Sequence, residues 1–139
     1  MEPATYKILA YFYLVDPVKT RTAEIYMDEN AILHIVMLEG VVVDVDDAVD
    51  NFLVAKHCSA DKPVLKLVDA RANFEINKPV QLFLDSKEIS ERTIARAFLM
   101  NSALKKVMFN FFVHSKLVPV KFFTDYKKAI VWLRSIQPA

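Results

Sequence analysis

The chain contains a single glycine, Gly40, among its 139 residues. Glycine-rich loops that cradle phosphates need several glycines at fixed spacing, because side chains there would block the approach of the phosphate. Nucleotide-binding loops of this kind are therefore excluded. Cysteine is equally scarce, since Cys58 is the only one. A lone cysteine excludes an internal disulfide and a multi-cysteine metal site, and it suits the reducing cytoplasm.

The chain also lacks a long hydrophobic run. The longest apolar stretch near the N-terminus, residues 8–15, is eight residues long, whereas a transmembrane helix needs about 20. No small-residue cleavage site follows this stretch, so it makes a poor secretory signal. We therefore expect a cytoplasmic protein without a membrane span, in which residues 1–20 form an N-terminal arm or an extra strand.

The net charge is only +1, but the charges are unevenly distributed. Residues 1–70 carry 6 Lys/Arg against 12 Asp/Glu, a net charge of −6, and residues 71–139 carry 12 against 5, a net charge of +7. This asymmetry fits head-to-tail association, an acidic partner for the C-terminal half, or ordinary solvated helix faces. The basic residues form no run with interleaved aromatics, so we expect no nucleic-acid partner.

Residue patterns typical of metal sites and of catalysis are missing as well. The histidines, His34, His57 and His114, lie far apart and have no metal-binding spacing. His57 precedes Cys58 directly, and neighbouring residues on a helix point about 100° apart, so the two do not form a reactive pair. No nucleophile, base and orienting group can be assembled from the spacings. We expect neither a metal nor a cofactor, and no enzymatic activity.

The hydrophobic pattern of the first half predicts a hairpin followed by a helix. Residues 21–28 and 31–38 are rich in β-forming residues, and Asp28-Glu29-Asn30 supplies turn chemistry between them. Gly40 breaks the chain before a valine triplet, and Asp44 stands in the position of an N-cap. The helix that follows should end at Lys56-His57. One of its faces is apolar and consists of Val45, Ala48, Val49, Phe52 and Ala55.

In the second half, strands are predicted at residues 64–68, 93–100 and 120–123, and helices separate them. The first of these helices should begin at Asn77, carry Pro79 in its first turn and run to about Glu88. Ser102 caps the next helix. Thr124-Asp125 opens the last one, whose inward residues should be Tyr126, Ala129, Ile130, Leu133 and Ile136.

The resulting order is β-β-α-β-α-β-α-β-α. Strands that alternate with helices imply right-handed crossovers and a largely parallel sheet, here with the first hairpin strand antiparallel at an edge. No repeat, low-complexity tract or linker interrupts the pattern. We therefore expect one α/β domain over residues 21–139.

Two segments carry a resemblance to a known fold. They are VLKLVDAR (residues 64–71) and PVKFFTD (residues 119–125), the latter followed by Ala129 and Trp132-Leu133. Together with the element order, they resemble the STAS or SpoIIAA-like fold, and more narrowly a group of small uncharacterised bacterial proteins with that fold. The likeness covers about residues 21–136. It implies a four-turn β/α superhelix used for regulated protein contacts, and related folds also hold small ligands or lipids.

The chain departs from the STAS pattern at the regulatory position. Members that switch by phosphorylation carry Ser or Thr at the start of the helix after the third strand, whereas residues 69–78 (DARANFEINK) contain no hydroxyl. A phosphate acts through its nearly two negative charges, which need a hydroxyl to be attached. Ser86, Ser90 and Thr93 lie farther on, at or after the end of that helix. We therefore expect a STAS-type module without the usual switch.

Asp69, Arg71 and Asn73 form the first candidate site. In open α/β sheets, ligands and partners gather beyond the carboxyl ends of parallel strands, where these residues should stand. A carboxylate and a guanidinium there can offer charge-assisted hydrogen bonds to a partner protein. In the purely structural alternative, Asp69 caps local backbone amides and Arg71 pairs with it.

Phe109, Phe112 and Val113 form the second candidate site, on the predicted aromatic helix over residues 102–115. Exposed, they would suit a partner helix, a second copy of the chain or a hydrophobic ligand, and buried they would belong to the core. Our first functional hypothesis is a non-enzymatic regulatory or protein-interaction module with an unknown protein partner. The alternative is a carrier or sensor of a small hydrophobic ligand or lipid held between the sheet and this helix.

Overall fold

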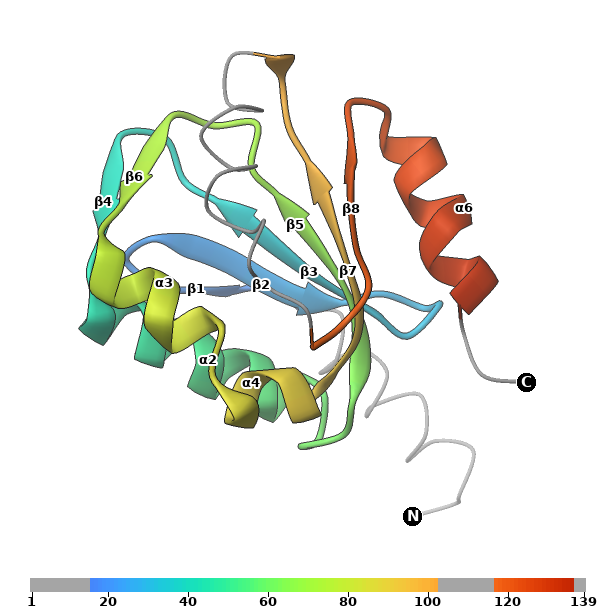
Figure 1. Ribbon diagram of the computed structural model, residues 1–139, viewed down its shortest axis with the longest axis horizontal. Helices are drawn as coiled ribbons and strands as arrows, with labels where there is room; N and C mark the ends of the chain where they lie inside the picture. The colour runs from blue at the N-terminus through green and yellow to red at the C-terminus, as the bar shows by residue number, and fades with distance from the viewer. Residues whose placement is uncertain (1–15, 103–116, 137–139) are drawn as a thin grey trace.

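A six-stranded mixed sheet forms the centre of the computed structural model, which describes residues 16–102 and 117–136 (Figure 1). The strands β3, β5, β7 and β8 run parallel to one another, while β1 and β2 pair antiparallel at one edge. The predicted mixed, mostly parallel sheet is confirmed. The strands follow the order β1 (Val18–Lys19), β2 (Ala23–Met27), β3 (Ile32–Met37), β5 (Val64–Asp69), β7 (Thr93–Leu99) and β8 (Val120–Phe123).

The antiparallel edge differs from the prediction in one respect. The first hairpin strand, β2, was expected at the edge of the sheet, but the two-residue strand β1 pairs with it and takes the edge position. β1 falls within the segment predicted as an arm or extra strand, and residues 8–15 lie outside the described part of the chain. The hairpin turn itself is confirmed, because the Asp28 carboxylate accepts hydrogen bonds from the backbone N–H groups of Asn30 and Ile32.

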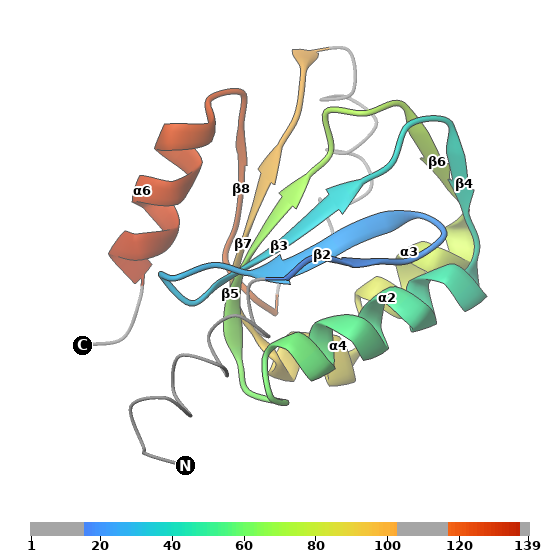
Figure 2. The same cartoon turned by 180° about the vertical axis from the view of Figure 1, so that it is seen from behind.

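Helices cover both faces of the sheet (Figures 1 and 2). Three of them, α2 (Val45–Cys58), α3 (Lys78–Leu84) and α4 (Lys87–Glu91), lie on one face, and α6 (Tyr126–Ile136) lies on the other. Side chains alternate along a strand, so β5 sends Leu65 and Leu67 toward α6, and Lys66 and Val68 toward the three-helix face. No helix within residues 16–102 and 117–136 combines the length and apolar character needed to cross a membrane.

Local signals define α2 well. Asp44 is its N-cap, and the Asp44 and Asp47 side chains each accept a hydrogen bond from the other residue's backbone N–H, which makes a capping box. The helix ends at Cys58, one residue beyond the prediction. Ala48, Phe52 and Ala55 from the predicted apolar face are buried against the sheet and α3.

A small second sheet was not predicted. β4 (Val41–Val43) pairs in parallel with β6 (Phe74–Ile76), and Gly40, at a φ of 75°, donates its backbone N–H to the Asn73 carbonyl oxygen at 2.7 Å. A positive φ of this kind favours glycine, which explains the position of the only one. Runs of three residues are too short to show an alternation, and their pairing depends on a contact between distant parts of the chain.

The helix predicted from Asn77 to about Glu88 is two helices. Asn77 caps α3 as expected, but α3 ends at Leu84, and Ser86 caps α4 by accepting a hydrogen bond from the Ile89 N–H at 3.4 Å. Asp85 and Ser86 both favour helix ends over helix interiors, because their side chains compete for backbone hydrogen bonds. The hydrophobic periodicity of the sequence continues through this break, so the sequence predicted one helix instead of two.

The last helix begins at Tyr126, as predicted, with the Asp125 carboxylate accepting from the Lys128 N–H at 3.1 Å. Ala129 and Leu133 are fully buried against the central strands. The inward placement of Tyr126 was wrong, because its exposed fraction is 45%. Tyr126 is the first residue of the helix, and its ring approaches His34 on β3 instead of entering the core.

Candidate functional site

A cavity of about 100 Å³ lies between the sheet and the three helices α2, α3 and α4. Its walls come from β3, β5 and β7 of the main sheet, from β4 and β6, and from all three helices. Among the described residues, the lining is hydrophobic except for Asn51, Lys66 and Arg96. Protein interiors contain few voids larger than a water molecule, so a cavity of this size is a candidate binding site.

Lys66 and Arg96 bring two positive charges into this apolar space. They are register partners on the adjacent parallel strands β5 and β7, and each residue is only 5% exposed. Within the described residues, no acceptor forms a hydrogen bond or ion pair with either side chain. Every fully buried side-chain nitrogen among the described residues has a hydrogen-bond partner. The cationic nitrogens of Lys66 and Arg96 have none among these residues, so they keep some accessible surface. They therefore border the cavity space and are not sealed within packed side chains.

Burial affects the protonation of Lys66 near neutral pH more than that of Arg96. It lowers the pKa of Lys66 from 10.5 to about 7, and the positive charges of Arg96 and Arg92 act in the same direction. Burial also lowers the pKa of Arg96 to about 10, against the opposing charge of Asp85. Near neutral pH, Arg96 therefore stays charged, while Lys66 changes between its charged and neutral forms.

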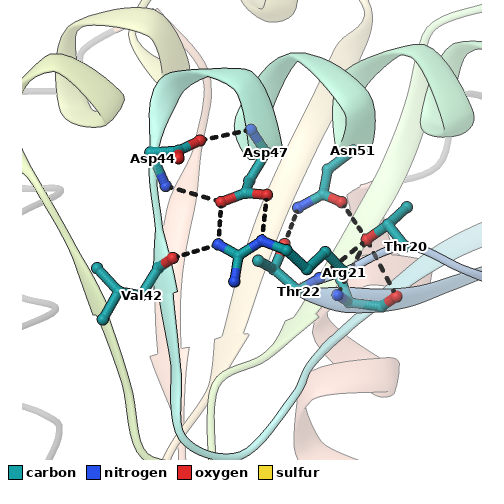
Figure 3. Close-up of polar contacts among 8 residues, drawn as sticks. Thr20, Arg21, Thr22, Val42, Asp44, Asp47 and Asn51 are labelled. Carbon is teal, nitrogen blue, oxygen red and sulfur yellow. Dashed lines mark hydrogen bonds and ion pairs between the residues drawn. The ribbon is translucent and has the colours of Figure 1, made fainter.

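The third polar lining residue, Asn51, is engaged elsewhere (Figure 3). Its side-chain amide donates to Thr22 Oγ1 at 2.9 Å, and its Oδ1 accepts from Thr20 Oγ1 at 2.6 Å. Both ends of the amide thus hold α2 against the β1–β2 connection. Asn51 belongs to the wall of the cavity, and each end of its amide already has one partner.

An ion pair completes the attachment of α2 (Figure 3). Arg21 donates from Nε to the Asp47 carboxylate at 2.8 Å, pairs with it a second time through its terminal nitrogen, and also donates to the Val42 carbonyl oxygen at 2.6 Å. The hydrogen bond from Arg21 is the main reason that the pKa of Asp47 falls to about 2. The network joins the β1–β2 connection to β4 and α2, and both of these elements contribute to the cavity wall.

Asp69 and Arg71 meet at the carboxyl end of β5. The Asp69 carboxylate accepts from the Arg71 backbone N–H at 3.2 Å, from its Nε at 3.0 Å and from a terminal nitrogen at 2.7 Å. This geometry matches the structural alternative, in which the two residues satisfy each other. The Arg71 side chain nevertheless stays 56% exposed, so its role in partner binding stays a prediction.

Asn73, the third residue of the first candidate site, has a different partner. Asn73 donates from its backbone and its side chain to the Glu39 carboxylate, both at 3.0 Å, and so joins the β3–β4 connection to the start of β6. Phe109, Phe112 and Val113 lie outside the described residues. The second candidate site therefore stays a sequence-based prediction.

A buried histidine on the opposite face is satisfied locally. His34 is 3% exposed, its Nε2 lies 2.7 Å from an Asp28 carboxylate oxygen, and its ring stacks on Tyr26 at 4.6 Å between centroids. Over the described ranges, no three His, Cys, Asp or Glu side chains gather as a metal site would require. This cluster supports the hairpin turn and leaves no donor set for an ion.

Sequence reasoning missed Lys66 and Arg96, although a signal was present. Each is a charged residue in the interior of a strand predicted to be buried, and such residues are rarely buried unless they are paired. A cation at the centre of VLKLV was therefore a reason to look for a counterion. The sequence could not show that the two cations lie side by side.

Comparisons with known proteins agree with this architecture. The crystal structure of an uncharacterized protein from Shewanella loihica PV-4, of the DUF3478 family and with a SpoIIAA-like fold, is similar to 84% of this chain and 98% of its own. The TM-score is 0.61 and the sequence identity is 15%, which confirms the predicted SpoIIAA-like fold. No curated protein matches the sequence. A family model matches residues 25–137, and the chain therefore belongs to the family described as Domain of unknown function (DUF7793).

Proposed function

We propose that the protein is a non-enzymatic, STAS-type module that binds a small, largely apolar molecule in the cavity beneath α2, α3 and α4. The observation that carries this proposal is the almost wholly hydrophobic lining of a cavity of about 100 Å³. An engineered apolar cavity of about 150 Å³ binds benzene, so the space suits a ligand of similar or slightly smaller size. The cavity is formed by regular elements on rigid supports, as expected of a preorganised site.

The ligand position differs from the one that the sequence suggested. The sequence-based alternative placed a hydrophobic ligand against the helix over residues 102–115, most of which lies outside the described residues. The proposal instead relies on residues of β3, β5, β7, α2, α3 and α4, all of which are described.

The proposal predicts that butyrate and 1-butanol, used as probes, cause NMR shifts in methyl groups that line the cavity. Ala48, which is 4% exposed on α2, lines the cavity, and Ala48→Met should fill part of it and weaken binding by about tenfold or more. Leu53→Met changes the solvent side of the same helix, where Leu53 is 53% exposed, and should leave binding unchanged. An absence of shifts with both probes would contradict the proposal.

A second candidate function is protein recognition at the carboxyl edge of the sheet. The observation in its favour is the Arg71 guanidinium, which Asp69 holds in a fixed orientation while it stays 56% exposed. A preorganised guanidinium suits an acidic partner. Residues 69–78 contain no hydroxyl, so this candidate includes no phosphorylation switch at that position.

Protein recognition predicts loss of a specific partner when both residues are removed. Wild-type protein should retain one protein from lysate of its source organism, and the Asp69→Ala/Arg71→Ala double variant should lose it. The Lys87→Ala/Glu91→Ala double variant removes another exposed ion pair and should behave as wild type. Equal retention by all three proteins would assign Asp69 and Arg71 a structural role only.

A further inference from the structure

The two cations in the cavity define the ligand more narrowly. We propose that the occupant is a carboxylate with a short apolar tail, whose head group is held by Lys66 and Arg96. This inference rests on the proposed function, because it specifies the ligand of the same cavity. It starts from an imbalance of charge, since two residues that are each 5% exposed carry cationic groups and no described carboxylate pairs with them.

Buried charges are rarely left without compensation. A cation removed from water either acquires a counterion and hydrogen-bond acceptors or loses its proton. Arg96 cannot take the second course at neutral pH, because the pKa of a guanidinium is too high even after burial. An anion in the adjacent cavity would supply the missing acceptors.

The arrangement of the two strands suits a head group with two oxygens. Lys66 and Arg96 are register partners on parallel strands, and neighbouring strands lie about 4.8 Å apart. The planar guanidinium matches a carboxylate in two-point contact, and the ammonium can donate to the same group from the side. A phosphate would bring a second charge and more acceptor oxygens. Asn51, the third polar residue of the described lining, already has one partner at each end of its amide, Thr20 and Thr22.

The volume and lining limit the tail. Apart from the three polar residues, the described lining consists of aliphatic and aromatic side chains such as Ile35, Met37, Val80 and Phe98. A cavity of about 150 Å³ holds the six carbons of benzene, so a space of about 100 Å³ suits a carboxylate with a tail of roughly two or three carbons. Propionate and butyrate have this form.

The site should also respond to pH. The groups that act on Lys66 are Arg96 on β7 and Arg92 before it, both cationic, and Asp85 at the end of α3 acts on Arg96. The α2 wall contributes the neutral Asn51. A carboxylate binds the protonated lysine more strongly, so binding at alkaline pH must be coupled to uptake of a proton. Affinity should therefore fall by about tenfold for each pH unit well above 7.

Isothermal titration of the full chain with matched probes tests this inference. Near neutral pH, butyrate should bind at least tenfold more tightly than 1-butanol or butanamide, which have a similar tail and lack the charge. Lys66→Met and Arg96→Met should each remove most of this preference while the binding of 1-butanol persists, which would show that the variants are folded and keep the cavity. Lys62→Met, on an exposed lysine just before β5, should change nothing.

The outcomes separate the inference from the proposed function. If 1-butanol binds wild type as tightly as butyrate, the carboxylate inference fails and the proposed apolar site stands. If neither probe binds, both fail. Inorganic phosphate that binds more tightly than butyrate, or displaces it at lower concentration, would also overturn the inference. An affinity for butyrate that does not change between neutral and alkaline pH would contradict the role of Lys66.

Discussion

Replacement of Lys66 with methionine should raise the free energy of unfolding of the ligand-free protein by up to roughly 5 kcal/mol in mildly acidic solution. Lys66 is buried beside Arg96, and burial holds its pKa at about 7 instead of 10.5. Methionine has a similar length, so it can keep most of the packing while it removes the desolvated charge. Replacement of buried charges by apolar residues of similar volume is often stabilising.

The direction in which stability changes with pH follows from the folded and unfolded pKa values of Lys66. Between the folded pKa of about 7 and the unfolded value of 10.5, the unfolded chain binds a proton at Lys66 that the folded protein has released. Stability should therefore rise as the pH increases through this window, and the full cost of the buried charge applies below it. In Lys66→Met, this contribution to the rise should disappear, so the stabilisation should be greatest at low pH and smallest at high pH.

Urea unfolding followed by Trp132 fluorescence at several pH values measures this effect. Measurements between about pH 6 and 9 avoid most titration of tyrosine and of the carboxylates. Lys62→Met serves as the control, because Lys62 is exposed and precedes the first buried residue of β5, Val64. A Lys66→Met variant with the same stability and the same pH slope as wild type would contradict a buried, destabilising cation.

Leu133→Ala should lower the free energy of unfolding by about 2–5 kcal/mol. Leu133 is fully buried where α6 packs on the sheet, in the cluster that contains Leu65, Leu67 and Ala97. Its truncation leaves a cavity that the surrounding β-strands cannot close. For a domain of this size, the loss should lower the Tm by roughly 10 °C in a thermal unfolding experiment.

Val131 provides the matched control on the same helix. Its side chain is 68% exposed, so Val131→Ala should change stability by less than about 0.5 kcal/mol. Butyrate titration of Leu133→Ala adds a second test, because α6 lies on the face of the sheet opposite the cavity. Folded Leu133→Ala protein should keep its affinity for butyrate. Equal destabilisation by Leu133→Ala and Val131→Ala would contradict the packing of α6 described above.

The cations at the cavity connect stability with binding. The proposed carboxylate binding requires positive charges in an apolar space, and the same charges weaken the empty protein. The ligand-free form should therefore be the less stable one near neutral pH, and a bound carboxylate should stabilise the fold increasingly as its concentration rises. Such an arrangement makes the stability of the domain sensitive to the ligand.

Much of the fold could be predicted because its signals are local. The cap at Asp44 and the spacing from Ala48 to Ala55 define α2 without reference to the rest of the chain. The break between α3 and α4 was hidden because Asp85 and Ser86 do not interrupt the hydrophobic periodicity. Tyr126 was misplaced because periodicity indicates a helix face and does not indicate where the sheet beneath it ends.

The candidate site was less predictable than the fold. Asp69 and Arg71 could be placed at a strand end from their position alone, and the structure brings the two together. The pairing of Asn73 with Glu39 joins residues 34 positions apart, which no local pattern indicates. Lys66 and Arg96 lie on strands that become neighbours only when the crossover through α3 and α4 is complete.

By itself, the sequence determined the succession of the longer strands β2, β3, β5, β7 and β8, the mostly parallel sheet and the exclusion of glycine-rich nucleotide loops. These features depend on composition and on short-range periodicity. Only the tertiary structure decided that Lys66 and Arg96 face the same cavity and that Asn51 is already engaged by Thr20 and Thr22. The physical reason is that burial and charge compensation are properties of neighbours in space. A strand pattern shows that a lysine lies in a sheet, but it does not show what surrounds it.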